Sequence, residues 1–119
     1  MKSLFITLCL LSMACADIQA QDNFQYFALI YTTGENWDTS IAHTDQPYFA
    51  EHSAFLAKLR KEGKIEIGAR YSDKGLIILK VKDEDEAKAL LAQDLSVTHK
   101  TFKAELFPFS PFYTGCIEK

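Results

Sequence analysis

The 119-residue sequence is poor in cysteine, and two of its three cysteines, Cys9 and Cys15, lie within the first twenty residues. If that segment is removed, only Cys116 remains, and one cysteine cannot form a disulfide within its own chain. Neither a C-x-x-C pair nor a zinc-ligand spacing is present. The shortage of cysteine therefore excludes a disulfide-rich scaffold and a zinc-finger type of metal site.

Basic residues are also scarce, since 13 Lys and Arg stand against 16 Asp and Glu. Losing residues 1–20 removes one charge of each sign, so the net charge stays at −3. Proteins that bind nucleic acid through its phosphates need clustered basic side chains and are usually basic overall. We therefore expect no nucleic acid partner.

Residues 1–20 have the pattern of a secretory signal peptide. Lys2 precedes an apolar stretch at 4–13, which is too short to span a membrane, and small residues follow it. Cleavage is expected after Ala16 or after Ala20. A third interpretation is lipidation of Cys15, which would attach the chain to a membrane. We expect an exported protein, periplasmic or secreted, with no membrane association unless Cys15 carries a lipid.

Residues 21–119 suit one domain, without repeats, low-complexity tracts or linkers. Apolar periodicity and turn residues predict four strands and two helices. The strands are expected at 24–32, 64–70, 76–82 and 101–109, and the helices at 47–62 and 83–94. An aromatic tail, residues 110–119, completes the domain.

The first predicted helix carries a histidine within its apolar stripe. The positions that share this stripe are Tyr48, Phe49, His52, Phe55, Leu56 and Leu59. Thr44 or Asp45 is expected to cap the helix ahead of Pro47, and Gly63 to end it. His52 is either a core histidine with a satisfied hydrogen bond or a functional group.

The second predicted helix ends on a carboxylate. Asp83 and Glu86 have the spacing of a capping box at its start. Its inward stripe is expected to hold Ala87, Leu90, Leu91 and Asp94. A negative charge at a helix C-terminus is unfavourable, so Asp94 is either a frayed residue in water or a functional group.

The order strand, helix, strand, strand, helix, strand predicts a ferredoxin-like α+β fold, a four-stranded antiparallel sheet with two helices on one face. The first and third strands become central, and both are apolar on both faces. The face without helices would stay exposed, which predicts a homodimer packed sheet to sheet. The start of the first helix and the end of the second lie at one end, so we expect His52 to contact Asp94.

The segment from His52 to Leu56, with Leu59, Gly63, Gly68 and Asp94, resembles the YCII-related (YciI-like) domains of the dimeric α+β barrel superfamily. The resemblance covers about residues 24–109 and implies that His52 and Asp94 are the active pair. Two departures stand out: Leu95 replaces a usual proline, and Ala69-Arg70 replaces a common Gly-Pro.

The resemblance favours a small exported enzyme of isomerase or lyase type that acts on a small organic molecule without a cofactor. His52 would be the general acid or base, and Asp94 would orient it. Arg70 is a candidate for binding a substrate carboxylate, and Tyr71 and Trp37 for lining the pocket.

Three alternatives remain open from the sequence. The pocket could belong to a small-ligand binding or sensing module without catalysis, or the His52–Asp94 contact could only pin the helices of a structural dimer. A haem or metal site would need His43, His52 and His99 to converge, and no spacing motif supports it.

Overall fold

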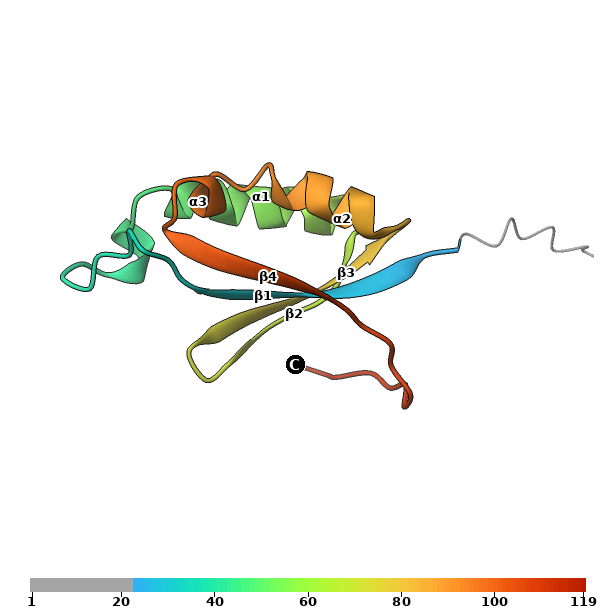
Figure 1. Ribbon diagram of the computed structural model, residues 1–119. Helices are drawn as coiled ribbons and strands as arrows, with labels where there is room; N and C mark the ends of the chain where they lie inside the picture. The colour runs from blue at the N-terminus through green and yellow to red at the C-terminus, as the bar shows by residue number, and fades with distance from the viewer. Residues whose placement is uncertain (1–22) are drawn as a thin grey trace, which may run out of the picture.

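The computed structural model describes residues 23–119, so the expected signal peptide and Cys15 lie outside the described residues. The elements appear in Figure 1 and follow one another along the chain. They are β1 (Gln25–Thr33), the 3₁₀ turn η1 (His43–Asp45), α1 (Phe49–Lys61), β2 (Ile65–Tyr71), β3 (Lys74–Val81), α2 (Glu84–Leu91), α3 (Leu95–Thr98) and β4 (Phe102–Pro108).

The four strands form one antiparallel sheet in the order β2-β3-β1-β4. The first and third strands are therefore central, as the apolar character of both their faces predicted. All the helices lie on one side of this sheet (Figure 1). The arrangement is an α+β fold compatible with the ferredoxin-like class.

The core lies between the sheet and the helices, and every second residue of the strands points into it. Phe27 and Leu29 of β1 are 3% and 0% exposed. Leu79 of β3 and Leu59 of α1 are each 1% exposed in the same cluster. The apolar stripe predicted for α1 is thus the face that packs on the sheet.

The expected cap of α1 is wrong. Thr44 and Asp45 belong to η1, and α1 begins only at Phe49, after Tyr48 adopts a left-handed backbone with φ of 65°. No side chain caps the helix. The ring of Tyr48 instead stacks on His99, with 3.9 Å between ring centroids, so a contact with a distant segment fixes the start of α1.

Gly63, directly after the C-cap of α1, has a φ of +73°, as its position in the sequence predicted. A Cβ there would meet no atom within 4 Å, so an alanine would be strained only through its backbone. We expect Gly63→Ala to lower the free energy of unfolding by about 1 kcal/mol. Urea denaturation measures this, with Gly115→Ala as a control because that glycine has no positive φ. Equal losses in both variants would contradict the explanation.

The second helix differs more from expectation. Its start is correct, since the Asp83 side chain accepts a hydrogen bond from the backbone N–H of Glu86 at 2.8 Å. However, α2 ends at Leu91, and Asp94 is the N-cap of a third helix, α3, where its side chain accepts from the N–H of Ser96. Placing Asp94 in the last turn of a second and final helix was therefore wrong. At an N-cap a carboxylate satisfies a free N–H group, whereas at a helix C-terminus it would meet only carbonyl oxygens.

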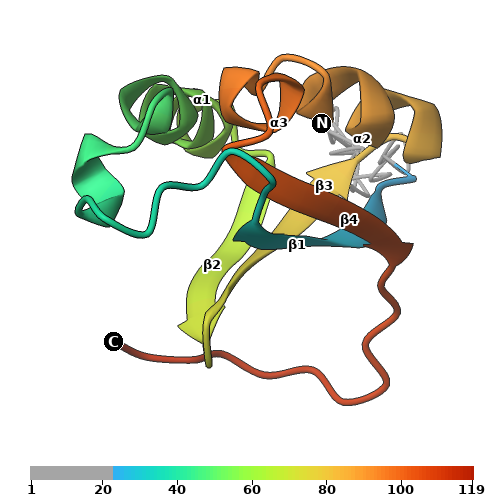
Figure 2. The ribbon, with the colours of Figure 1, turned by 60° about the vertical axis from the view of Figure 1, so that its left-hand side comes forward.

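The opposite face of the sheet carries no helix (Figure 2). We call it the open face, and it consists of Tyr26, Ala28 and Ile30 of β1, Leu76, Ile78 and Lys80 of β3, Ile67, Ala69 and Tyr71 of β2, and Lys103, Glu105 and Phe107 of β4. Phe107 and Tyr71 are 49% and 46% exposed on it. The chain after β4 passes beneath this face (Figure 2).

Candidate functional site

The site centres on a buried contact between His52 and Asp94. His52 lies in the second turn of α1 on the face that packs against the sheet, and Asp94 precedes α3. The distance from Nδ1 of His52 to Oδ2 of Asp94 is 2.8 Å, and Asp94 is fully buried. The sequence prediction that these two residues meet is confirmed, although Asp94 arrives from a different element.

Both carboxylate oxygens of Asp94 are occupied by hydrogen-bond donors. Oδ2 accepts from the hydroxyl of Tyr31 at 2.9 Å in addition to His52. Oδ1 accepts from the backbone N–H of Ser96 at 3.1 Å and from its hydroxyl at 2.7 Å. A carboxylate surrounded by donors keeps its charge even when it is dry.

The pKa of Asp94 reflects two opposed effects. Burial alone would raise this pKa, but the hydrogen bonds from His52, Ser96 and Tyr31, and the positive charge that His52 carries when it is protonated, outweigh burial and hold the pKa below its ordinary value. Asp94 is therefore ionised at neutral pH. It acts as a fixed negative charge beside the imidazole.

This charge determines which nitrogen of His52 carries the proton. An ionised carboxylate can only accept, so the neutral imidazole must hold its hydrogen on Nδ1. No hydrogen bond reaches Nε2 within residues 23–119, and no buried side-chain N or O in that region lacks a partner. Nε2 is thus open to the cavity that His52 lines, with its lone pair free.

Tyr31 was missed as a site residue by the sequence analysis. It lies on the inward face of β1, and its ring meets that of His52 edge to face at 4.8 Å between centroids. Burial, then the negative charge of Asp94, then the hydrogen bond to that carboxylate raise the pKa of Tyr31 far above its ordinary value. The phenol therefore stays neutral and donates permanently to Asp94.

A cavity of about 560 Å³ opens beside His52 between α1 and the β2–β3 hairpin. Its walls are mainly apolar. The lining residues are Tyr31, Thr32, Thr33, Trp37, His43, Phe49, His52, Ser53, Leu56, Gly68, Ala69, Arg70, Asp73, Lys74, Gly75, Ile77 and Phe102. Such a cavity is large enough for a small organic molecule.

Of the three predicted substrate-binding residues, Trp37 and Arg70 line this cavity and Tyr71 does not. Consecutive residues of a strand point to opposite faces, so Tyr71 follows Arg70 onto the open face. Lys74 at the cavity rim is paired with Asp73 at 3.0 Å. Arg70 forms no ion pair with any residue of the described chain, which leaves its guanidinium available.

The three histidines do not converge. His43 and His52 both line the cavity, with His52 bound to Asp94, but His99 does not line it and stacks on Tyr48. Among residues 23–119 no three histidine, cysteine or acidic side chains are grouped so that they could hold a metal ion. In the same part of the chain, no helix has the length and apolar character needed to cross a membrane.

Comparisons of the chain with models of protein families, with curated proteins and with solved structures found no match.

Proposed function

We propose that this chain is an exported YCII-like protein and an enzyme of isomerase or lyase type that moves a proton on a small organic molecule. The observation that carries the proposal is the 2.8 Å contact from His52 Nδ1 to a buried, ionised Asp94, with Nε2 open to a cavity. A histidine held in this way is a general base near neutral pH.

Catalysis would begin when Nε2 of His52 removes a proton from a substrate carbon. The imidazolium that forms is stabilised by Asp94, whose position is held by Tyr31 and Ser96. Returning the proton to a second atom of the substrate gives an isomerase. Returning it to a leaving group gives a lyase.

The cavity favours a substrate with an apolar body and a carboxylate. Trp37, Phe49 and Phe102 supply aromatic walls near His52, with 4.7 Å between the ring centroids of Phe102 and His52. Arg70, on β2, supplies a guanidinium suited to bidentate binding of a carboxylate. This positive group and the base would act on opposite ends of the same molecule.

We also propose that the protein is a homodimer of the dimeric α+β barrel type. Its open face is rich in apolar side chains, including Ile67 at 36% exposure and Phe107 at 49%. Soluble monomers seldom leave a contiguous apolar surface of this kind in water. Two copies packed open face to open face would bury it and place a helix layer on each outer side.

A non-catalytic binding or sensing module is the second candidate, favoured by the aromatic walls of the cavity. In that case the cavity holds a ligand and Nε2 of His52 only accepts a hydrogen bond. A purely structural dimer is the third, because the His52–Asp94 contact also ties α1 to α3. Only the enzyme would exchange a proton of its substrate with water, and this separates it from the other two candidates.

Proton exchange with deuterium oxide tests the proposal even while the substrate is unidentified. Small molecules that co-purify with the exported protein are first identified by mass spectrometry. These molecules, and a panel of 2-oxo and 3-oxo acids with aliphatic and aryl bodies, are then incubated with the protein in deuterium oxide. We expect the protein to replace a carbon-bound hydrogen of one such acid with deuterium, detected by NMR. A bound acid without exchange would instead support the binding module, and neither binding nor exchange would support the structural dimer.

A further inference from the structure

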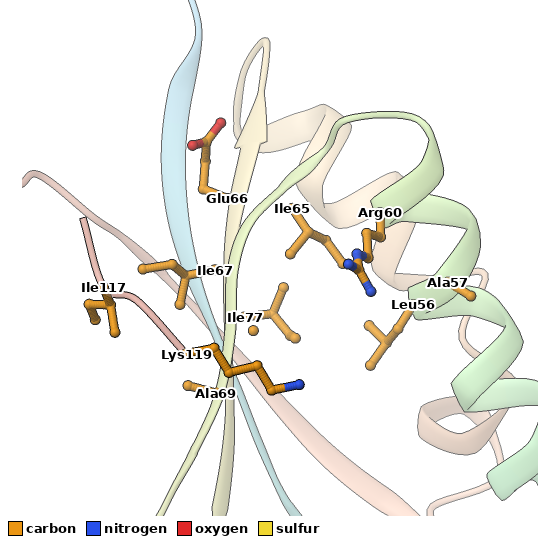
Figure 3. A pocket seen from close by; sticks show the side chains of 11 residues that line it. Leu56, Ala57, Arg60, Ile65, Glu66, Ile67, Ala69, Ile77, Ile117 and Lys119 are labelled. Carbon is orange, nitrogen blue, oxygen red and sulfur yellow. The ribbon is translucent and has the colours of Figure 1, made fainter. Parts of the chain in front are cut away.

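The tail, residues 110–119, crosses the whole width of the open face without packing on it. It leaves the sheet at β4, passes beneath the strands and ends beside β2, at the opposite edge (Figure 2). There Ile117 and Lys119 border a groove of about 660 Å³ together with Ile67 and Ala69. Figure 3 shows Ile117 on one side of β2, the residues of α1 on the other, and the side chain of Lys119 extending across β2 toward α1.

The apolar side chains of the tail remain in solvent. Phe112, Tyr113 and Ile117 are 90%, 89% and 85% exposed. The backbone N–H of Phe109 donates to the carbonyl of Tyr26 at 2.9 Å, and beyond it no hydrogen bond joins the tail to the rest of the described chain. A tail that served to cover its own sheet would bury these side chains, since each gains about 2 kcal/mol from leaving water.

The open face and the tail thus both expose apolar side chains to the same space. The open face lies on one side of it and the tail on the other (Figure 2). The charged side chains of the open face are already paired, Lys80 with Glu66 of β2 at 3.7 Å and Lys103 with Glu105 at 3.9 Å. A surface of this kind can meet a copy of itself without opposing blocks of like charge.

We infer that the tail is an arm that clasps a second copy of this chain. The partner's sheet lies on the open face, and Phe112, Tyr113 and Ile117 pack against the partner instead of their own strands. A two-fold axis makes the clasp reciprocal, so each copy is held by the other's arm. The inference rests on the proposed pairing of open faces but not on the proposed chemistry at His52.

Removing the arm tests its contribution to the dimer. The exported protein is compared with a variant that stops after Phe109 and with a full-length variant carrying Phe112→Ser, Tyr113→Ser and Ile117→Ser. Glu118→Gln is the matched control within the arm. We expect both arm variants to raise the dimer dissociation constant at least about tenfold in analytical ultracentrifugation, because three large contacts are lost. The control should leave it unchanged.

A cross-linking experiment shows which copy the arm touches. A photoreactive phenylalanine replaces Phe112 in a chain of normal isotopes, which is mixed with an equal amount of unmodified chain labelled with ¹⁵N. After irradiation we expect the light arm to be joined to heavy peptides, which come only from the partner copy.

The results distinguish the proposed clasping by the arm from the proposed pairing of open faces. A dimer whose dissociation constant is unchanged in both arm variants would overturn the arm and leave the pairing of open faces in place. Cross-links only between light arm and light sheet at full dimer occupancy would also overturn it. A chain that is monomeric at every concentration tested would overturn both, whether or not His52 exchanges protons.

Discussion

Replacing Asp94 with asparagine is expected to lower the free energy of unfolding by about 3 kcal/mol at pH 7. The carboxylate accepts from His52, Tyr31 and Ser96 inside the core. An asparagine has the same shape, but its amide NH₂ would point hydrogens at donors that need an acceptor. At least one buried donor then loses its partner, together with the favourable charge.

The same substitution should remove a pH dependence. The folded pKa of Asp94 is lowered, so Asp94 contributes stability that is complete above its unfolded pKa of about 3.9 and is lost as pH falls through the folded pKa. The difference between the native protein and Asp94→Asn should therefore shrink below about pH 4. Urea denaturation of both proteins from pH 7 to pH 3 measures it.

Tyr31→Phe is the matched control for Asp94→Asn. It removes one donor to Asp94 and leaves the carboxylate with His52 and Ser96. We expect a loss of about 1 kcal/mol and an acid limb like that of the native protein. If the native and Asp94→Asn curves ran parallel down to pH 3, folding would not lower the pKa of Asp94, and the surrounding hydrogen bonds would not stabilise its charge.

Replacing His52 with glutamine should have a large effect on activity and a small one on stability. We expect proton exchange on a substrate to fall by a factor of about 10² to 10⁴, because glutamine cannot take up a proton. Its amide can still donate to Asp94, so the free energy of unfolding should fall by only about 1 kcal/mol. Exchange rates by NMR and urea denaturation measure the two effects separately.

Rescue by added base distinguishes catalysis from structural support. His52→Ala opens space beside the cavity, and imidazole in solution should restore part of the exchange if Nε2 is the base. Glu51→Gln is the control on the same helix, since Glu51 is exposed on its outer side. Unchanged exchange in His52→Gln, or a stability loss as large as that of Asp94→Asn, would favour the structural role.

Much of the fold follows from local patterns in the sequence. The first and third strands carry apolar residues on both faces, and such strands lie in the middle of a sheet. The stripe containing Phe55 and Leu59 required one buried face for α1. Asp83 was predictable as a cap because the hydrogen bond it makes is local.

The details of the site were less predictable because they depend on distant contacts. The spacing of Leu91 and Asp94 continues a helical stripe, yet the chain starts a new helix there, because Asp94 caps α3 while accepting from residues of α1 and β1. Leu95, where the resembling family usually has proline, is the first residue of α3, a position where proline needs no N–H donor.

Tyr31 belongs to the site but was not predicted, whereas Tyr71 was predicted but does not line the cavity. Tyr31 stood out only as one of several large side chains on a strand, since its hydroxyl acquires a role through a carboxylate 63 positions away. Tyr71 was predicted to line the cavity because it is next to Arg70, but only Arg70 of the two does so. Alternation alone could not exclude Tyr71, since the neighbours Ala69 and Arg70 both line the cavity.

Because Tyr31 belongs to the central strand β1, the site around His52 can come apart only when β1 leaves the sheet. β1 is hydrogen-bonded to a strand on each side, so opening it requires the sheet to come apart. Segments of this kind exchange their amide hydrogens only through global unfolding, whereas the tail makes no such bonds beyond Phe109. The amide hydrogens of the tail should therefore exchange first. The geometry around His52 should persist until the whole domain melts.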